Sequence, residues 1–379
     1  MRPSPDPLRG RRLRILQVAA LPFPSAQGSQ VYVRGMALAL ARRGHDVTVV
    51  CYAHGQGKPD PEYRVARTPS IPGYQNLRSG PDLIKPLLDA ALAARVASLD
   101  ADIVHAHNFE APLAAALARL LRRRPLVYNA HTSLAEELPS YFSRRPARWL
   151  SRRLGSRLDR SIPRLADAAI AISERNADFL RAIGCANVAH IPPGVHADEL
   201  VPATPMPLPP GPWVVYAGNP DQYQDLDVLE AAMRQLPSVG LLLVSASRMD
   251  AWLRKGLPRV KVVQTPDFSV VRRYLAAADV AALPRSVCSG YPIKLLNYLG
   301  MGLPTVAAKG SARDMPGVIV VPDRDPDAMA RALRSLVQQP ARCAMLGEAA
   351  RQHIRNVCTW EQRIQDIEQV YADLLGTPR

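Results

Sequence analysis

The segment from residue 288 to residue 307 reads CSGYPIKLLNYLGMGLPTVA. Its pattern predicts a glycine turn at Gly290, then a short amphipathic helix and, after GLP, a buried strand. A turn that leads into a helix presents unpaired backbone N–H groups, which bind anions. No carboxylate occurs from Cys288 to Pro304, and the one charged residue there is Lys294. The segment is therefore a candidate anion site, with a packing helix that carries an exposed lysine as the alternative.

Short apolar runs alternate with amphipathic stretches on both sides of this segment. The runs are continuous in Val, Ile and Leu, which is typical of parallel strands buried on both faces. The chain is therefore predicted to be α/β, with two doubly wound, Rossmann-like parallel sheets. The predicted strands are 13–20, 45–51, 102–107, 125–130, 167–172 and 187–191 in the first half, and 213–217, 240–245, 260–264, 279–283, 304–308 and 317–321 in the second.

The length of 379 residues suits two domains. We place the first domain at 12–200 and the second at 213–358, and we expect them to face each other across a cleft. The stretch 201–212, VPATPMPLPPGP, is too proline-rich for a helix or a strand and is predicted to be a stiff linker. Residues 359–379 predict an amphipathic C-terminal helix that packs across the domain junction.

The net charge of +15 is unevenly distributed, because residues 1–200 carry 28 Lys and Arg against 17 Asp and Glu. Such an excess indicates a polyanionic partner: nucleic acid, an anionic membrane or a phosphorylated substrate. No nucleic-acid reader motif accompanies the basic residues, so nucleic acid is not expected. Five cysteines without CxxC spacing indicate reduced thiols in a cytoplasmic protein. No apolar run is long enough to predict a membrane-spanning helix, and the N-terminal LRILQVAALPF fits a strand better than a signal peptide.

Polar residues follow several predicted strands of the first domain, where ligands of doubly wound domains bind. Gly28 and Ser29 begin a helix whose N-terminus can hold an anion, with a plain turn capped by Ser29 as the alternative. His131 follows the strand at 125–130 and can donate to a ligand hydroxyl, unless it is a structural histidine. His105 and His107 share one strand face, but no third ligand joins them, so no metal is expected.

In the second domain, the YAGN stretch follows the strand at 213–217. Gly218 permits a tight turn, while Asn219 and Gln224 can hydrogen-bond a phosphate or a hydroxyl without supplying charge. Ser289 and Asn297 are eight residues apart, about two helical turns, so both can address the same edge of a ligand.

The order and spacing of these motifs resemble retaining glycosyltransferase family 4, which has the GT-B fold. The resemblance implies transfer of a sugar from a nucleotide-diphosphate donor to a glycan or lipid-linked acceptor, without a metal, in cell-envelope polysaccharide or glycolipid synthesis. It extends from about Arg14 to Leu375 and is carried by PSAQGSQVYVRGMALALARRGHDVTVV, DIVHAH, the His131 segment, AAIAISE, HIPPGVH, YAGN, ADVAALP, SGYPIKLLNYLGMGLPTV and TWEQR.

The resemblance also distributes the candidate residues over a site. His131 is the candidate catalytic residue, and Gly28, Ser29, Gln30 and Asn108 are the acceptor-side candidates. The donor-binding candidates are Gly218, Asn219, Gln224, Arg285, Ser289, Gly290, Tyr291, Pro292, Ile293, Lys294 and Asn297.

Four charged residues typical of the family are neutral here. An arginine and a lysine that hold the donor diphosphate are replaced by Asn219 and Gln224, and two glutamates near the ribose and the donor sugar are replaced by Ser289 and Asn297. A donor site that uses Lys294 and Arg285 instead is one interpretation. A catalytically silent homologue that acts as a partner in a polysaccharide machine is another. A nucleotide-sugar epimerase is a third, although the acids and histidines it needs are not clustered in the sequence.

The stretch 144–164 contains eight arginines and one aspartate. Leu150, Leu154, Leu158 and Ile162 form an i,i+4 stripe with Trp149 beside it. A basic amphipathic helix with a tryptophan can lie on an anionic membrane, which would place the protein at the inner face of the cell membrane. The alternative is a helix that packs its leucines inward and leaves a solvated basic face.

Overall fold

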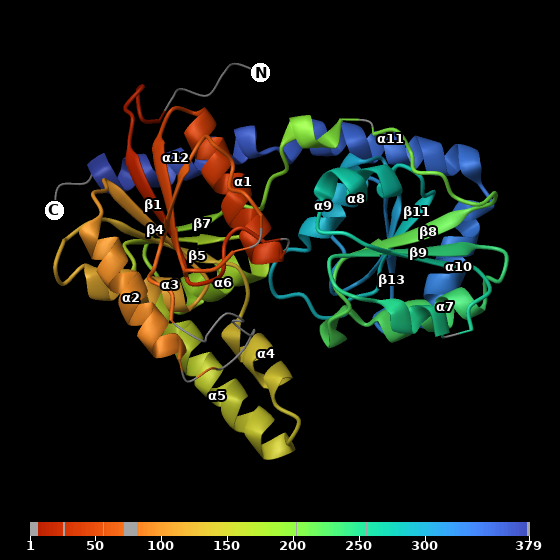
Figure 1. Ribbon diagram of the computed structural model, residues 1–379, viewed down its shortest axis with the longest axis horizontal. Helices are drawn as coiled ribbons and strands as arrows, with labels where there is room; N and C mark the ends of the chain where they lie inside the picture. Colours follow the sequence, from red (N-terminus) through yellow and green to blue (C-terminus); the bar gives the residue numbers. More distant parts are fainter. Residues whose placement is uncertain are drawn as a thin grey trace. The chain divides into compact units, whose positions relative to one another are not determined.

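The structure, a computed structural model, describes residues 7–25, 27–55, 57–71, 82, 84–201, 203–254 and 256–376. The chain divides into two compact units, each with one parallel sheet and helices on both faces (Figure 1). Unit 1 comprises Met1–Gly194, Ser289–Tyr291 and Trp360–Arg379, and unit 2 comprises Val195–Cys288 and Pro292–Thr359. Residue 202 of the predicted linker and residues 377–379 of the predicted C-terminal helix lie outside the described residues.

The sheet of unit 1 has the strand order β3-β2-β1-β4-β5-β6-β7, and every neighbouring pair is parallel. Six of these strands lie on the predicted apolar runs. The sequence RVAR of β3 was not predicted as a strand, because it is short and carries two arginines. The strands are β1 (Arg14–Ala19), β2 (Asp46–Cys51), β3 (Arg64–Arg67), β4 (Ile103–His107), β5 (Leu126–Ala130), β6 (Ala168–Ala171) and β7 (Val188–His190).

The two faces of this sheet differ in polarity. Leu16 and Val18 of β1 pack with leucines and alanines of α2 and α3 in an apolar core. The intervening Gln17 and its neighbour His105 on β4 are fully buried on the other face, which bears on the site described below. The helices of unit 1 are α1 (Gly28–Arg42), α2 (Lys85–Ser98), α3 (Glu110–Ala118), α4 (Leu134–Glu137), α5 (Arg145–Ser161), α6 (Glu174–Ala182) and α12 (Trp360–Gly376), with 3-10 turns η1 (Leu138–Tyr141) and η2 (Ile162–Leu165).

The C-terminal helix α12 belongs to unit 1, where it packs on α1. A side chain at Gly35 of α1 would overlap the indole of Trp360, so the glycine allows close approach. The Arg43 guanidinium donates to Glu368 over 2.9 Å, and His45 Nε2 lies 3.1 Å from the same carboxylate. These two groups hold the pKa of Glu368 below its ordinary value against the effect of burial.

The sheet of unit 2 has the strand order β10-β9-β8-β11-β12-β13, again parallel throughout. All six strands lie on predicted runs. They are β8 (Trp213–Ala217), β9 (Gly240–Ser245), β10 (Val260–Gln264), β11 (Val280–Leu283), β12 (Thr305–Ala308) and β13 (Val318–Val321).

Helices cover both faces of this second sheet. Buried residues of α7 and α10 pack with Val214 and Tyr216 of β8, and residues of α8 and α9 pack with Trp213 and Val215. The helices are α7 (Leu226–Arg234), α8 (Phe268–Leu275), α9 (Ile293–Gly300), α10 (Pro326–Val337) and α11 (Pro340–Val357), with 3-10 turns η3 (Ala197–Leu200), η4 (Gln222–Gln224) and η5 (Asp250–Arg254). No helix in the described parts of the chain is long and apolar enough to span a membrane.

The proline-rich stretch lies along unit 2. The Met206 N–H donates to the carbonyl of Arg273 over 3.1 Å, and the Arg259 guanidinium donates to the carbonyl of Pro210 over 2.6 Å. Met206 and Leu208 also pack against the core beside α8. These contacts attach the described part of the stretch to unit 2, and its role as a stiff linker stays a prediction.

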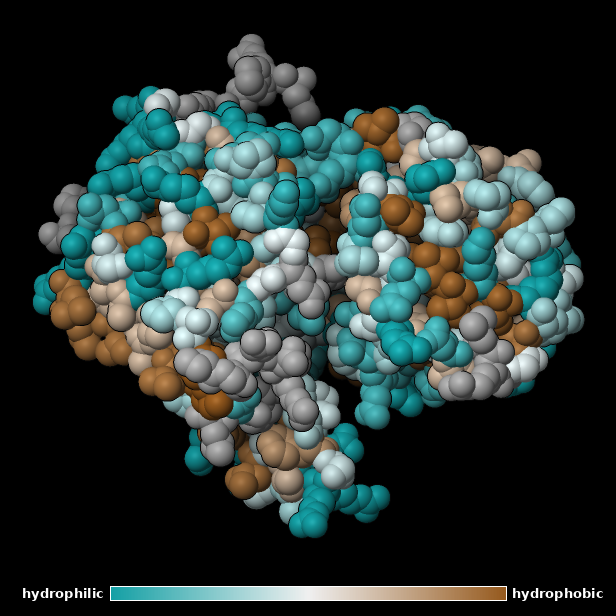
Figure 2. Space-filling model, in the orientation of Figure 1, coloured by the Kyte–Doolittle hydropathy of each residue, from teal (hydrophilic) through white to brown (hydrophobic). Residues whose placement is uncertain are grey.

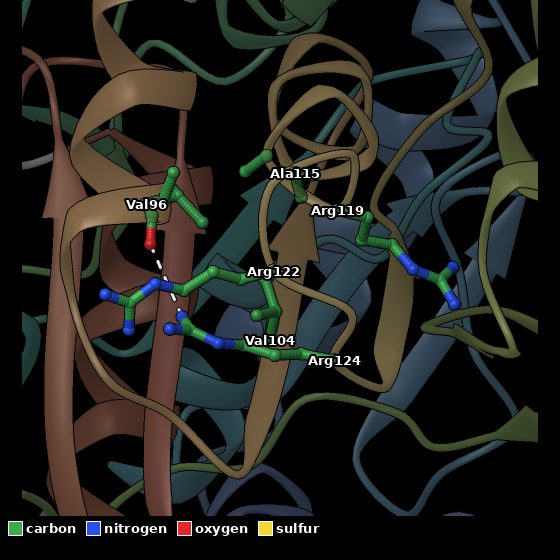
Figure 3. Close-up of a pocket in the computed structure, with 8 residues that line it drawn as sticks. Val96, Val104, Ala115, Arg119, Arg122 and Arg124 are labelled. Carbon is green, nitrogen blue, oxygen red and sulfur yellow. Dashed lines mark hydrogen bonds between the residues drawn. The ribbon is translucent and has the colours of Figure 1, made fainter.

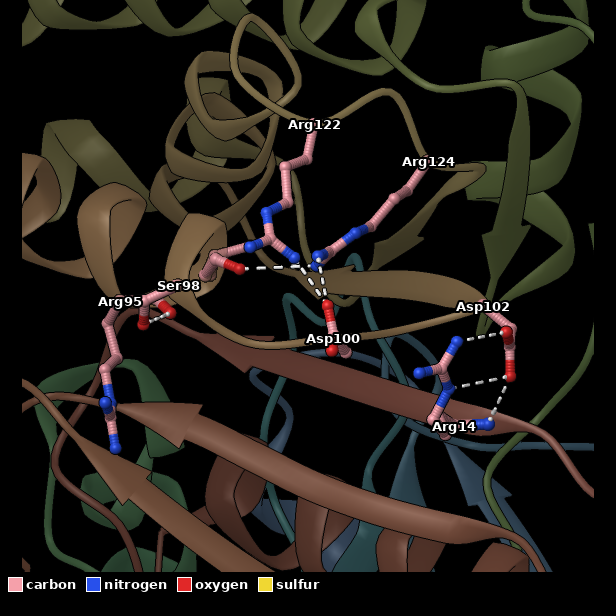
Figure 4. Close-up of polar contacts among 8 residues, drawn as sticks. Arg14, Arg95, Ser98, Asp100, Asp102, Arg122 and Arg124 are labelled. Carbon is pink, nitrogen blue, oxygen red and sulfur yellow. Dashed lines mark hydrogen bonds and ion pairs between the residues drawn. The ribbon is translucent and has the colours of Figure 1, made fainter.

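Arginines gather at the amino ends of β1, β4 and β5. Arg124 lies in a small cavity lined by Val96, Val104 and Arg122, and donates to the carbonyl of Val96 over 3.4 Å (Figure 3). Arg14 pairs with Asp102 over 3.0 Å, and Arg122 pairs with Asp100 over 2.5 Å (Figure 4). This cluster connects the starts of neighbouring strands, at the edge opposite to the carboxyl ends where ligands bind.

Candidate functional site

Lys294 lies at the carboxyl end of β8 in unit 2. It is the second residue of α9, and its Nζ donates to Tyr216 Oη over 2.9 Å and to Gln224 Oε1 over 3.0 Å. The same Nζ lies 4.4 Å from the centre of the Tyr216 ring, a cation–π contact. The predicted cation is therefore held beside Gln224, one of the residues at which the family's usual charge is missing.

The environment of Lys294 favours its neutral form. Burial, and to a smaller extent the nearby Arg285, lower the pKa of Lys294 to about 7, although Asp221 and Cys288 act in the opposite direction. The desolvation of the ammonium is thus only partly offset by nearby negative charge. A bound phosphate would supply the missing negative charge.

Gly218 makes the position of Lys294 possible. Its φ of +153° is one that residues with a side chain rarely adopt, and a Cβ there would lie 2.4 Å from Lys294 Nζ. The next residue, Asn219, accepts hydrogen bonds at Oδ1 from Ser245 over 3.4 Å and Ser247 over 3.3 Å. Tyr216 Oη donates to the Asn219 carbonyl over 2.9 Å. The turn after β8 therefore frames the lysine with neutral hydrogen-bonding groups.

Arg285 is the second cation near this turn. It follows β11, its Nε donates to the carbonyl of Val287 over 2.6 Å, and its guanidinium lies 4.7 Å from the centre of the Tyr223 ring. Tyr223 in turn donates to Asp221 over 2.8 Å. Arg285 and Lys294 thus bring two cations to the carboxyl ends of β8 and β11.

Asp225 is a residue that sequence reasoning missed. It has a φ of +51°, is almost fully buried, and accepts from the Ser286 N–H and the Arg324 guanidinium, each over 2.7 Å, and from Ser286 Oγ over 2.5 Å. The carboxylate therefore ties the loop after β11 to the turn after β8. An acid within the segment NPDQYQDLDV gave no local signal for this role, because its partners are 61 and 99 residues away.

The predicted donor residues around α9 are divided between the units. Pro292 precedes α9, Ile293 begins it, and Asn297 is a half-buried residue one turn beyond Lys294. Ser289, Gly290 and Tyr291 belong to unit 1. There the Ser133 N–H donates to Ser289 Oγ over 3.2 Å, the Ser173 hydroxyl donates to the Ser289 carbonyl over 2.9 Å, and a Cβ on Gly290 would lie 2.2 Å from the carbonyl oxygen of His131.

His131 lies in a buried aromatic cluster of unit 1. Its Nε2 is 3.1 Å from His107 Nδ1, and its ring centre is 4.6 Å from that of Tyr32. His105 stacks on His107, and its two ring nitrogens contact Tyr371 Oη over 2.6 Å and Asn129 Oδ1 over 3.2 Å. Burial lowers the pKa of His131 to about 3 and that of His105 to about 4. The rings are therefore neutral, and in this arrangement the His131 side chain contacts protein groups.

The acceptor-side candidates lie at the carboxyl ends of β1 and β4. Gly28 begins α1, Ser29 is half-buried, and Gln30 is buried and donates from Nε2 to Gln27 Oε1 over 3.2 Å. Gln27 occupies the N-cap position, so the alternative in which Ser29 caps this helix is wrong. Asn108 has a φ of +62° directly after β4. These candidates share one edge of the sheet.

No group of three potential metal ligands occurs among the described residues. Within unit 2, the described site therefore consists of two cations, hydrogen-bonding amides and hydroxyls, and a helix N-terminus. Such an arrangement suits a phosphorylated ligand.

Comparisons with known proteins match both halves of the chain to glycosyltransferases. Residues 26–199 match the family described as Glycosyltransferase Family 4, and residues 211–339 match Glycosyl transferases group 1. The D-inositol 3-phosphate glycosyltransferase of Xylanimonas cellulosilytica is 28% identical, with 96% of this chain and 97% of that protein covered. The phosphatidyl-myo-inositol mannosyltransferase of Mycobacterium leprae is 25% identical, with 86% and 88% covered.

Solved structures share the fold over nearly the whole chain. Sucrose-phosphate synthase from Thermosynechococcus elongatus has a TM-score of 0.82 at 21% identity, with 96% of this chain and 100% of that chain covered. HepE of Anabaena in complex with UDP-glucose has a TM-score of 0.68 at 17% identity, with 96% and 100% covered. The predicted fold class, two Rossmann-like domains of the GT-B type, is thereby confirmed.

Proposed function

Because the chain belongs to glycosyltransferase family 4, we propose that it transfers a glycosyl group, with retention, from a nucleoside-diphosphate sugar to a hydroxyl of a glycan or lipid-linked acceptor. The observation that carries the donor assignment is the partly buried Lys294, held between Tyr216 and Gln224 with its pKa lowered to about 7. A buried ammonium without a carboxylate partner is stabilised by an anionic ligand, and a diphosphate is one.

Lys294 takes over the role that a basic pair has in other members of the family. Gln224 stands where the family usually has a lysine, and Lys294 reaches from α9 to within 3.0 Å of the Gln224 amide oxygen. Arg285 contributes a second charge from the loop after β11. The diphosphate then meets two cations, as in the usual arrangement, although they come from different elements.

The chemistry needs little from the side chains beyond positioning and electrostatics. The bond between the anomeric carbon and the diphosphate oxygen breaks, the acceptor oxygen bonds to the same carbon, and the acceptor proton passes to the leaving diphosphate. Lys294 and Arg285 stabilise the negative charge that develops on the diphosphate. Hydrogen bonds from neutral groups such as Asn219 and Asn297 orient the donor.

The acceptor is proposed to be anionic or carried on a lipid. The relatives named above act on D-inositol 3-phosphate and phosphatidyl-myo-inositol, according to their names. Residues 1–200 carry the larger part of the positive charge of this chain, which suits a phosphorylated acceptor. A role in cell-envelope polysaccharide or glycolipid synthesis at the inner face of the cell membrane follows from such an acceptor.

A catalytically silent homologue is the second candidate, and the neutral residues at four usually charged positions favour it. Titration calorimetry with UDP-, GDP-, ADP- and dTDP-sugars, followed by assays of donor hydrolysis, separates the two. Binding with slow hydrolysis that Lys294→Ala abolishes supports the transferase. Binding of no nucleotide by wild-type protein contradicts it. Arg331→Ala, at an exposed position of α10, removes one charge from unit 2 and is the matched control.

A further inference from the structure

The buried residues that attach helix α5 to unit 1 are small or polar, and none of them is a leucine. They are Ser151, Gly155 and Asp159, spaced four apart on one face. A Cβ on Gly155 would lie 2.7 Å from the backbone nitrogen of Ala135, so the backbones of α4 and α5 are in close contact. Asp159 accepts hydrogen bonds from the N–H groups of Leu134 and Ala135 over 2.9 and 3.0 Å. The α4–α5 pair extends from the body of unit 1 (Figure 1).

A neighbouring face of α5, about 100° around the helix from the buried one, is apolar and exposed. Leu150 is 63% exposed, Leu154 is 50% exposed, and Trp149 beside them is covered on one side by Arg153, whose guanidinium is 4.1 Å from the ring centre. Inward packing of the whole leucine stripe, the alternative considered from the sequence, is therefore wrong for Leu150 and Leu154. Leu158 is half-buried, and Ile162 alone of the four is fully buried.

A second exposed leucine stripe runs along α3 and the turn that follows it. Leu113, Leu117 and Leu121 are spaced four apart and exposed, and Leu120 beside them is 80% exposed. Helix α3 lies against η2, the continuation of α5, because Arg119 donates to the carbonyl of Leu165 over 3.0 Å. Figure 2 shows hydrophobic side chains at the surface over this side of unit 1. We call the exposed leucines of α3 and α5, together with Trp149, the α3–α5 surface.

Arginines surround the α3–α5 surface. From Arg144 to Arg164 the chain has eight arginines and one acid, Asp159; Glu136 and Glu137 precede this stretch, and each of the three acids is engaged within unit 1. Asp159 is held by α4 as described, Glu136 pairs with Arg175, and Glu137 accepts from Thr132 and Tyr141. The arginines of α5 itself are exposed, and none of them pairs with a carboxylate among the described residues. The surface is therefore both apolar and strongly basic.

We propose that the α3–α5 surface docks the protein on a bilayer that contains anionic phospholipids. Leucine and tryptophan side chains enter the acyl–headgroup boundary while arginines contact the phosphates, which satisfies both features of the surface. A second copy of the chain placed symmetrically on this surface would bring like charges together. Nucleic acid would meet the arginines but leave the leucines exposed. The proposal deepens the proposed function, since it names the partner that would present a lipid-linked acceptor.

The test is co-sedimentation of the full chain with vesicles of phosphatidylcholine alone or mixed with phosphatidylglycerol, without donor or acceptor. Wild-type protein should bind the mixed vesicles, and added salt should weaken binding. Arg152→Gln/Arg153→Gln/Arg157→Gln should lower the partition coefficient on the order of 100-fold. Leu150→Ser/Leu154→Ser on α5 and Leu117→Ser/Leu121→Ser on α3 should each reduce binding to mixed vesicles. These positions are exposed, so folding should be unaffected, which circular dichroism checks.

Exposed residues of unit 2 provide the control variants for this test. Arg248→Gln/Arg331→Gln/Arg342→Gln removes the same charge from unit 2 and should bind as wild type does, as should Val320→Ser. The proposal would be overturned if the α5 variants, or the α3 variants, bound the mixed vesicles as strongly as wild-type protein does. It would also be overturned if wild-type protein sedimented as a dimer and the leucine variants as monomers. The vesicle assay contains no donor or acceptor, so failure of membrane binding would leave the transferase proposal standing. Failure of nucleotide binding in calorimetry would likewise leave the membrane proposal standing.

Discussion

Gly218 and Lys294 form a steric pair: a Cβ on Gly218 would lie 2.4 Å from Lys294 Nζ. The glycine after β8 therefore provides the space in which the lysine of α9 approaches Gln224 at 3.0 Å. This relationship explains why a tight turn and a distant helical lysine belong to one site, and it can be tested from either residue.

Gly218→Ala should weaken nucleoside-diphosphate binding about as much as Lys294→Ala does, on the order of 10- to 100-fold, because a charged hydrogen bond is worth about 1.5–3 kcal/mol. The double variant should be little worse than either single variant, since both act through the same ammonium. Titration calorimetry with UDP and GDP measures all four affinities. Gly376→Ala, at a glycine with open space around it, is the control. Additive losses would show that Gly218 and Lys294 act separately.

Donor affinity should fall as pH rises through 7. Burial lowers the pKa of Lys294 to about 7, so the free protein loses this charge above that pH. A bound diphosphate favours the ammonium and raises the pKa, so binding at pH 8 should take up a proton from the buffer. Calorimetry in buffers of different ionisation enthalpy measures that uptake. Lys294→Arg stays charged and should show a flatter pH dependence, and equal proton uptake by both proteins would contradict the assignment.

Asp225→Asn should destabilise unit 2 and weaken donor binding. The buried carboxylate accepts from Ser286 and Arg324, and loss of its charge leaves those donors poorly paired, at a cost of about 3 kcal/mol. Urea unfolding measures the change in free energy of unfolding. Asp227→Asn, an exposed acid two residues away on α7, should change stability little. Equal effects of the two variants would show that the Asp225 carboxylate does not hold the loop after β11 against the turn after β8.

The histidine cluster should make unit 1 sensitive to acid. The pKa values of His105 and His131, about 4 and 3, lie below the ordinary value of 6.5, so folding favours the neutral rings. Their contribution to stability is complete above pH 6.5 and is lost as pH falls from there toward 4, with a slope of about 1.4 kcal/mol per pH unit for each ring. Unfolding measured from pH 7 to pH 4.5 should show this slope, and His105→Gln should reduce it. His190→Gln, at the end of β7, is the comparison: burial lowers the pKa of this ring too, but the residue is more exposed, so the slope should fall less.

The sequence predicted twelve of the thirteen strands found among the described residues, because buried parallel strands are continuous in Val, Ile and Leu, which is a local signal. It also singled out Lys294 as the cation of a donor site, an assignment that stays a prediction. Which face of α5 is buried was harder to predict, since leucines spaced at i,i+4 suggested a face that packs in the core. The contact with α4 is in fact made by Ser151, Gly155 and Asp159, whose small or polar side chains resemble a solvated face.

Asp225 shows a second limit of the sequence. Its positive φ and its partners Ser286 and Arg324 depend on tertiary contacts, and nothing in its neighbourhood along the chain distinguishes it from Asp221 or Asp227. The three clustered histidines, His105, His107 and His131, were noted from the sequence, but their burial depends in part on α12, whose Tyr371 contacts His105 across 266 residues of sequence.

Exchange of Gln224 and Lys294 tests whether the neutral residues reflect a re-tuned donor site. Lys294→Gln alone should lose donor affinity on the order of 10- to 100-fold, as a charged hydrogen bond is removed. Gln224→Lys alone places a second ammonium next to Lys294, where the Gln224 oxygen is now 3.0 Å from Nζ. At an effective dielectric of about 20, like charges near 4 Å repel by up to about 4 kcal/mol, so this variant should be less stable without nucleotide. The double variant keeps one cation in the same space, at the position usual in the family, and should recover most of the wild-type affinity for UDP or GDP.

Calorimetry on the four proteins measures these affinities, and thermal unfolding checks that each variant is folded. A double variant as weak as Lys294→Gln would mean that charge at this place does not hold the diphosphate, and the preference for an active transferase over a silent homologue would lose its main support.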